Sequence, residues 1–150
     1  MWQDIQPDVV EFTNGLLELS GLDLTATAET GEDGIKVQIS GPDVALLLGH
    51  NAELLDAIEY LCNRAFLRET GHEARIVLDS GNYRARREKE LRLMAQKAAE
   101  RVRTTRVPFT FDPMSPSERR IIHLALGEDQ TVRTESRGNG VDRKVTIVPA

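Results

Sequence analysis

The sequence has little of what disulfides and metal sites require. It contains one cysteine, Cys62, which excludes an internal disulfide. Its three histidines, His50, His72 and His123, lie far apart, and no H-x-x-x-H or C-x-x-C pair occurs. Metal-binding motifs place such ligands at short, regular spacings. We therefore expect no metal and no other cofactor.

Long apolar runs and catalytic groupings are also missing. No apolar run approaches the ~20 residues that span a bilayer, and the opening MWQDIQPDVV lacks the basic-then-apolar layout of a signal peptide. Together with the lone cysteine, this favours a cytoplasmic protein without direct membrane insertion. Asp56 and Glu59 are spaced as a carboxylate pair on a helix, but no nucleophile or base accompanies them, so we expect no enzyme.

Charge is distributed unevenly along the chain, although the formal net charge is only −5. Residues 1–80 hold 4 Lys/Arg and 15 Asp/Glu, a net charge of −11. Residues 81–150 hold 15 Lys/Arg and 9 Asp/Glu, a net charge of +6. A division this sharp predicts two functional units, of which the second has the charge expected of a polyanion-binding surface.

Hydrophobic periodicity over residues 5–80 predicts the order helix, strand, strand, short helix, longer helix, strand. In the second strand, Ile35, Val37 and Ile39 alternate with polar residues, which is typical of a strand with one buried face. Trp2 lies before these elements, where fraying is expected, and we assign it no role. The expected ranges are 8–20, 24–30, 35–40, 43–48, 54–65 and 75–78.

The second half is predicted to begin with a long helix over about residues 83–105, with an apolar and a basic stripe on opposite sides. The segments VPFTFD, TVRTES and KVTIV then predict a small three-stranded sheet, with a short helix after Asp112-Pro113. The two halves together predict an α+β fold. The apolar stripe consists of Leu91, Ala95, Ala98 and Val102, and the basic stripe of Arg86, Lys89, Lys97 and Arg101.

The short helix carries an arginine pair and a histidine in the stretch SERRIIHLAL. Its start has the form of a capping box, in which Ser115 accepts from the amide of Glu118 and the Glu118 carboxylate reaches back. On a helical wheel, Arg119, Arg120 and His123 share an arc of about 100°. Ile121, Leu124 and Ala125 lie opposite.

These polar side chains match the chemistry of a nucleic-acid ligand. A guanidinium grips phosphate with two parallel hydrogen bonds or stacks on a base, and an imidazole also stacks on a base. A solvated helix face with an incidental histidine fits the same spacing. The final strands add further basic residues that favour the nucleic-acid interpretation: Arg133, Arg137, Arg143 and Lys144.

Longer stretches resemble a known family. Arg119-x-x-x-His123, set in DPMSPSERRIIHLAL, resembles the motif that names the R-three-H domain, a small three-stranded sheet with helices packed on it. The run LDSGNYRARREKELRLMAQKAAERV is similar to the segment that links the two domains of the bacterial Jag family, also called SpoIIIJ-associated or KhpB proteins. The element order upstream, which includes LLDAIEYL, is similar to that family's KH domain. The resemblance implies a KH-like domain at residues 5–80 and an R-three-H domain at residues 81–150, with no room for the additional N-terminal domain of many members.

The resemblance also implies a function: non-catalytic binding of single-stranded RNA or DNA, with RNA favoured. It further implies a post-transcriptional role linked to cell shape or division, a link to a membrane-protein insertase, and a small KH-only protein as partner. A homo- or heterodimer would form through the KH-like half. Arg119 and His123 would be the central contacts. Electrostatic attraction to the nucleic-acid backbone would come from Arg120, Arg84, Arg87 and Arg143.

The sequence departs from this family in the loop that grips the backbone. A KH domain uses a GXXG loop, and its place is taken here by Gly49-His50-Asn51-Ala52, which lacks the second glycine and any basic residue. Asp43, Glu53 and Asp56 lie nearby in the sequence and would repel a phosphate. The rival hypothesis is therefore an interaction adaptor, in which the acidic half docks a protein partner and nucleic-acid binding is vestigial.

Overall fold

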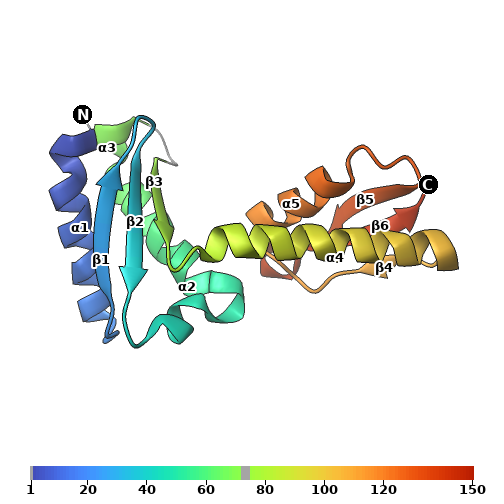
Figure 1. Cartoon of the computed structure of the whole chain (residues 1–150), viewed down its shortest axis with the longest axis horizontal. Helices are drawn as coiled ribbons and strands as arrows, with labels where there is room; N and C mark the ends of the chain where they lie inside the picture. The colour runs from blue at the N-terminus through green and yellow to red at the C-terminus, as the bar shows by residue number, and fades with distance from the viewer. Residues whose placement is uncertain (1, 72–74) are drawn as a thin grey trace. The chain divides into compact units, whose positions relative to one another are not determined.

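The computed structural model describes residues 2–71 and 75–150, so that His72 lies outside the described residues. The chain forms two compact units, Met1–Arg84 and Ala85–Ala150, which we call unit 1 and unit 2 (Figure 1). Each unit packs helices on a three-stranded sheet, which confirms the predicted α+β class. Within the described ranges, no helix is both long enough and apolar enough to cross a membrane.

Unit 1 follows the predicted order of elements. Strands β1 and β2 pair antiparallel and β2 and β3 pair parallel, giving the sheet order β1-β2-β3. The two predicted helices between β2 and β3 are the two parts of one kinked element, α2, and a short helix, α3, follows it. The elements are α1 (Trp2–Leu19), β1 (Thr25–Thr30), β2 (Ile35–Ser40), α2 (Val44–Ala65), α3 (Leu67–Thr70) and β3 (Ile76–Asp79).

The core of unit 1 lies between one face of this sheet and helices α1 and α2. The alternation predicted for β2 is confirmed, because Ile35, Val37 and Ile39 are buried while the residues between them are not. The hairpin that aligns β1 with β2 requires glycine at position 34. A Cβ there would lie 2.1 Å from the carbonyl oxygen of Arg75, far inside van der Waals contact.

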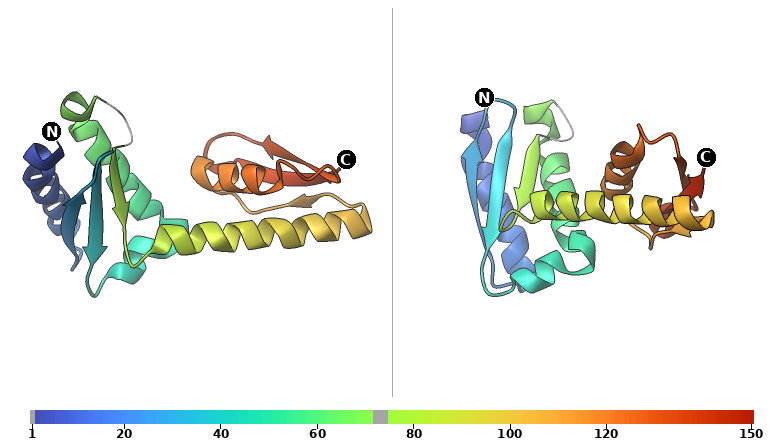
Figure 2. Two further views of the ribbon diagram at one scale, coloured as in Figure 1. Left: turned by 45° about the horizontal axis from the view of Figure 1, so that its top comes forward. Right: turned by 45° about the vertical axis from the view of Figure 1, so that its right-hand side comes forward.

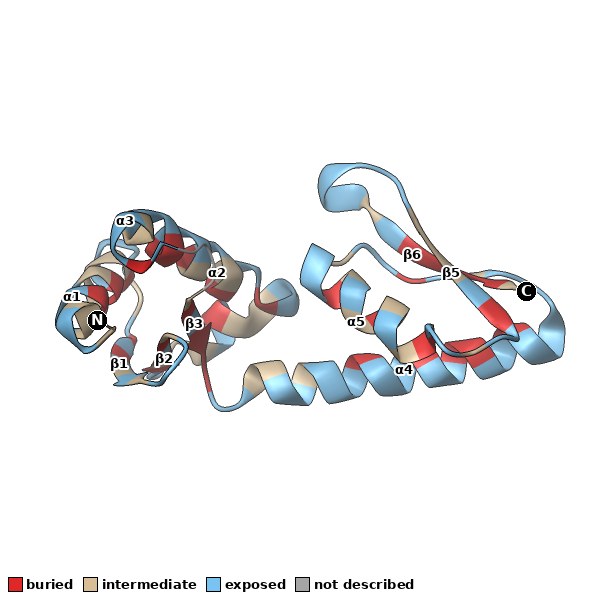
Figure 3. Ribbon diagram, turned by 90° about the horizontal axis from the view of Figure 1, so that it is seen from above, coloured by how far each residue is buried: buried red, intermediate tan, exposed pale blue. Residues whose placement is uncertain are grey.

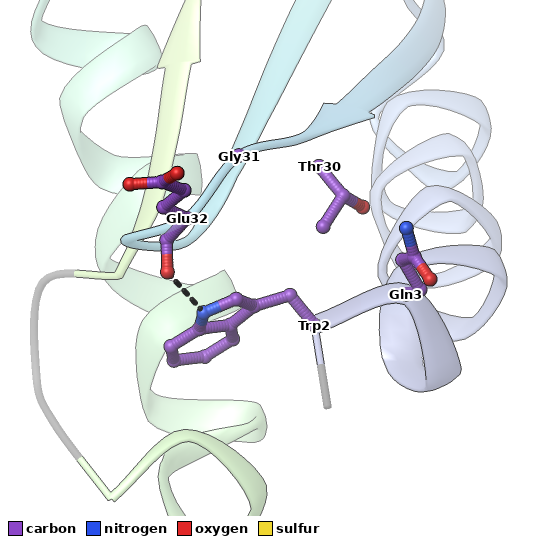
Figure 4. A pocket seen from close by; sticks show the side chains of 5 residues that line it. All are labelled: Trp2, Gln3, Thr30, Gly31 and Glu32. Atoms are coloured by element: carbon purple, nitrogen blue, oxygen red, sulfur yellow. Dashed lines mark hydrogen bonds between the residues drawn. The ribbon is translucent and has the colours of Figure 1, made fainter.

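The expectation that the chain is frayed at Trp2 is wrong. Helix α1 begins at Trp2, several residues before the predicted start, and the indole packs against the core of unit 1. The indole nitrogen donates to the carbonyl oxygen of Glu32 at 3.1 Å, which joins the helix start to the β1–β2 turn. Trp2, Gln3, Thr30, Gly31 and Glu32 line an open pocket of about 410 Å³ (Figure 4). A large aromatic side chain near a terminus is therefore held by the tertiary fold.

Unit 2 is built along the long helix α4. Its sheet has the order β4-β6-β5, with both pairs antiparallel, and runs alongside α4 in Figures 1 and 2. The predicted apolar stripe of α4 is buried along one side of the helix (Figure 3). The elements are α4 (Tyr83–Thr105), β4 (Phe109–Thr110), α5 (Pro116–Leu126), β5 (Val132–Arg137), a 3-10 turn (Gly140–Asp142) and β6 (Lys144–Pro149).

Helix α5 starts as predicted and buries one charged residue. Ser115 Oγ accepts a hydrogen bond from the amide of Glu118 at 3.3 Å. The Glu118 carboxylate does not reach back, because it pairs with Arg87 of α4 at 2.8 Å. The buried residues are Glu118, Ile122 and Leu126, whereas Leu124, on the side opposite the polar arc, is 60% exposed. The buried side of α5 therefore combines two core side chains, Ile122 and Leu126, with the ion pair of Glu118 to α4.

Candidate nucleic-acid interface

The side chain of His123 is held between helix α5 and strand β5. Its Nδ1 lies 2.6 Å from Thr134 Oγ1, and its Nε2 lies 2.7 Å from Ser136 Oγ. Thr134 and Ser136 are alternate residues of β5, so their side chains lie on the same face of the sheet. That face is the helix-covered one, because Thr134 pairs with the buried Ile147 of β6. Both ring nitrogens are thus occupied by hydroxyl groups while the ring remains half-buried.

Two arginines lie close to this histidine. Arg119 donates to the carbonyl oxygen of Met114 at 2.7 Å, and Arg143 donates to that of Gly138 at 2.7 Å. A carbonyl oxygen orients a guanidinium without neutralising its charge. In the described part of the chain, no carboxylate pairs with either arginine.

The effect of these charges on His123 is a lowered pKa. Burial of the ring is the largest cause, followed by the positive charges of Arg119 and Arg143, which disfavour a further cation. The ordinary pKa of a histidine is near 6.5, so His123 is neutral at pH 7. Three groups predicted from the sequence to act together, Arg119, His123 and Arg143, are therefore close enough to interact.

The other predicted cations have different surroundings. Arg120 is exposed on α5. Arg87 forms ion pairs with Glu118 at 2.8 Å and with Glu90 at 3.1 Å, and it joins α4 to α5.

Arg84 belongs to unit 1, where it pairs with Asp56 and Glu59, each at 2.9 Å. Its Nε also donates to the carbonyl oxygen of Leu78 at 2.6 Å. The carboxylate pair that the sequence presents at positions 56 and 59 thus has a structural partner. Burial raises the pKa of Glu59, and the hydrogen bond from the Leu78 amide and the Arg84 charge oppose that rise.

The basic residues of the sequence do not all contribute free charge. The four residues of the basic stripe on α4 are exposed, and Arg101 lies over the ring of Phe109 at 6.0 Å. On β5, Arg133 and Arg137 both pair with Glu135 on the face that points away from the helices. Ion pairs therefore neutralise part of the basic surface of unit 2. Arg119 and Arg143, held by backbone carbonyls, form a separate positive cluster with His123.

Sequence reasoning missed Thr134 and Ser136. The alternation in TVRTES places these two residues on one face of a strand. Nothing in that pattern indicates which helix covers the face, because the contact joins residues 11 and 13 positions apart across a turn. The partners of His123 become visible only when α5 is packed on β5.

The Gly49-Ala52 loop forms a sharp kink within α2. Its last three residues, His50, Asn51 and Ala52, have φ values of 54°, 58° and 61°, all in the left-handed region. This region costs a non-glycine residue roughly 1–2 kcal/mol. Ala52 is also buried, at 1% exposure, so its methyl group packs into the core of unit 1.

The carboxylates near this loop are partly engaged. Asp43 accepts a hydrogen bond from the amide of Asp23 at 2.7 Å, and Asp56 pairs with Arg84. Glu53 is exposed beside the loop. The loop therefore combines a strained backbone, an exposed carboxylate and no basic side chain of its own.

Comparison with known proteins matches this part of the chain to a named domain. The model of the R-three-H domain matches residues 89–149, which contain the whole cluster around His123. The RNA-binding protein KhpB of Clostridium symbiosum is 31% identical over 147 residues, covering 97% of this chain and 66% of that protein. The protein of the same name from Bacillus subtilis is 32% identical over 123 residues, covering 81% of this chain and 59% of that protein.

The match to these relatives runs through both units, although the chain spans less than two thirds of their length. A KhpB protein of Streptococcus pneumoniae is 23% identical over 145 residues, again across 97% of this chain. Residues 89–149 form an R-three-H domain, and the chain belongs to the bacterial KhpB (Jag) family.

Proposed function

We propose that the chain binds single-stranded nucleic acid, RNA in particular, through the surface of unit 2 around Arg119, His123 and Arg143. The observation that carries the proposal is the pair of guanidinium groups held by backbone carbonyls beside a neutral histidine. Charged donors of this kind suit phosphate oxygens. The relatives named RNA-binding proteins support RNA as the ligand.

The remaining predicted cations act differently in this proposal. Arg120 adds charge beside the cluster. Arg87 contributes through position, because its ion pair with Glu118 holds α5 on α4. Arg84 pairs with two carboxylates within unit 1 and adds no free charge to the proposed surface. The proposed activity is binding without catalysis, in the cytoplasm.

A second role concerns unit 1. The Gly49-Ala52 loop lacks a basic side chain, and the unit is acidic overall, which favours a protein partner over a phosphate backbone at this site. The proposed partner is a small KH-only protein or a second copy of the chain, bound through the KH-like residues 5–80. Under the rival adaptor hypothesis, this would be the main function and unit 2 would bind nothing.

Fluorescence anisotropy with labelled single-stranded RNA and DNA separates these hypotheses. We expect Arg119→Ala/His123→Ala to weaken binding by about tenfold to hundredfold, because charge-assisted hydrogen bonds are lost. The slope of log affinity against log salt should be about −0.7 for each phosphate contacted.

The matched control is Arg133→Ala, which removes one positive charge from the opposite face of the same sheet. It should leave the affinity within about twofold, since an exposed, paired arginine contributes little. Equal losses of affinity in both variants would mean that only the net charge of the protein matters, which contradicts a defined binding site. A wild-type protein that binds neither strand at low salt would support the adaptor hypothesis.

A further inference from the structure

Two hydroxyl groups stand at the centre of the proposed interface, and neither belongs to the Arg-x-x-x-His motif. Thr134 Oγ1 and Ser136 Oγ flank the ring of His123, one at each nitrogen, and both side chains are half-buried. We propose that these hydroxyls bind phosphate oxygens of the nucleic acid, and that His123 is a positioning residue that directs their protons outward. The inference rests on the proposed function and names the contacts of that site.

Counting protons explains why the histidine controls the hydroxyls. A neutral imidazole has one N–H donor and one acceptor nitrogen. The hydroxyl that accepts from the N–H keeps its own proton for an external ligand, whereas the other gives its proton to the ring. The free protein therefore directs one hydroxyl proton toward solvent. If His123 gains a proton, both nitrogens donate and both hydroxyl protons become available to a phosphate.

The charged surroundings couple this proton to the ligand. The groups that oppose protonation of His123 are Arg119 from α5 and Arg143 from the turn before β6, while β5 contributes only the two neutral hydroxyls on this face. Glu135 lies between those hydroxyls in sequence but on the opposite face of the strand. A phosphate bound between the two guanidinium groups offsets their charge and adds a negative one, so it favours the imidazolium. Binding of the nucleic acid should therefore be accompanied by uptake of a proton at His123, and the affinity should rise as the pH falls toward about 6.

This geometry differs from direct contact by the histidine. Both ring nitrogens of His123 are already within 2.7 Å of a hydroxyl, so neither is open to a ligand without breaking a hydrogen bond. Under the proposal, the loss caused by replacing His123 comes mainly from misdirected hydroxyls. Removing the hydroxyls themselves should then cost as much as removing the ring.

The first test removes the hydroxyls and keeps the shape. Thr134→Val/Ser136→Ala should weaken binding of an oligouridine RNA, labelled with a cyanine dye that does not titrate near neutral pH, by about tenfold, as expected for lost hydrogen bonds to a charged group. The matched control is Thr110→Val/Thr146→Val, which removes a hydroxyl pair bonded at 3.0 Å on the other face of the same sheet. The control should bind as the wild type does. Equal affinity in wild type and Thr134→Val/Ser136→Ala would overturn the proposal.

The second test follows the proton. Uracil does not titrate between about pH 5.5 and pH 8, so a pH dependence with this RNA reports on the protein. Wild-type affinity should rise as the pH falls through this range, by up to about tenfold per pH unit for one proton taken up. In His123→Gln, which keeps one donor and one acceptor but does not titrate, the rise should disappear while most of the affinity at pH 8 remains. An unchanged pH profile in His123→Gln would contradict the positioning role.

A separate probe distinguishes failure of this inference from failure of the proposed function. If the wild type binds no RNA at low salt, the NMR signals of the His123 ring nitrogens can be followed while inorganic pyrophosphate is added. A shift toward the imidazolium that is lost in Thr134→Val/Ser136→Ala would support the anion site even though RNA binding had failed. The absence of that shift would overturn the anion site as well.

Discussion

Arginines in the two units are held by different partners. In unit 1, Arg84 donates to two carboxylates and one carbonyl, so its charge is more than balanced. In unit 2, Arg119 and Arg143 are each held by a backbone carbonyl. Both arrangements orient a guanidinium, but only the second leaves its charge for a ligand. The difference shows that counting basic residues overestimates a binding surface until their partners are known.

The two units also differ in the surroundings of their histidines. His123 of unit 2 is pinned by two hydroxyls beside positive charges, whereas His50 of unit 1 lies exposed in the strained Gly49-Ala52 loop. One unit therefore presents an ordered polar cluster, and the other presents a backbone turn without cationic side chains. Four variants or conditions test this contrast.

The largest effect is expected at the buried ion pair that holds α5 in unit 2. Arg87→Met would leave the Glu118 carboxylate, only 8% exposed in its side chain, without this cation. One Glu118 oxygen, Oε2, already has no hydrogen-bond partner. Breaking such a pair costs about 3–5 kcal/mol of the free energy of unfolding.

Hydrogen exchange of the amides in α5 and β6 would measure that loss. The double variant Arg87→Met/Glu118→Gln should recover much of it, because no buried charge remains. If the double variant were as unstable as Arg87→Met, lost packing would be the cause.

A smaller loss is expected for Arg84→Met in unit 1. The ion pairs of Arg84 are about a third exposed, so solvent screens them, and we expect a loss of about 1–2 kcal/mol. Trp2 is the only tryptophan and packs on the core of unit 1, so its fluorescence during urea denaturation reports on this unit. The affinity for RNA should remain close to that of the wild type. A loss as large as that expected for Arg119→Ala/His123→Ala would place Arg84 in the interface.

Relief of backbone strain should stabilise unit 1. Ala52→Gly places a residue without Cβ at a φ of 61°, which removes a cost of roughly 1 kcal/mol. The lost methyl group is buried and offsets part of this gain. Because a buried methyl group contributes about 0.8 kcal/mol, we expect a small net stabilisation, measured as an increased urea midpoint by Trp2 fluorescence. A clear decrease would mean that the packing of the methyl group outweighs the strain.

The smallest effect concerns pH and the stability of unit 2 without ligand. Because the pKa of His123 is lower in the folded state than in the unfolded chain, the unfolded state takes up the proton first. The contribution of His123 to stability is therefore complete above about pH 6.5 and declines as the pH falls below it. As the pH falls below about 6.5, the urea midpoint of the wild type should therefore fall relative to that of His123→Gln. A wild type that gains stability relative to His123→Gln at pH 5.5 to 6.5 would contradict the lowered pKa.

Much of each unit was predictable because short-range patterns carry the information. The alternation of β2, the buried stripe of α4 and the Ser115 cap are local features, and all three are observed. The start of α1 was not predictable in this way, since it depends on a hydrogen bond from Trp2 to a residue 30 positions away. The burial of Glu118 on α5 was not predictable for a similar reason, because its partner Arg87 lies 31 positions away in the sequence.

For the candidate site, the sequence alone determined the residue types and their spacing on one helix: Arg119 and His123, one turn apart, in a basic half of the chain. The tertiary structure decided which charges remain available. It paired Arg84 and Arg87 with carboxylates, held Arg119 and Arg143 on carbonyls, and placed Thr134 and Ser136 at the ring of His123. Helical spacing follows from backbone geometry over a few residues, whereas the partner of a charged side chain depends on which distant segments pack against it.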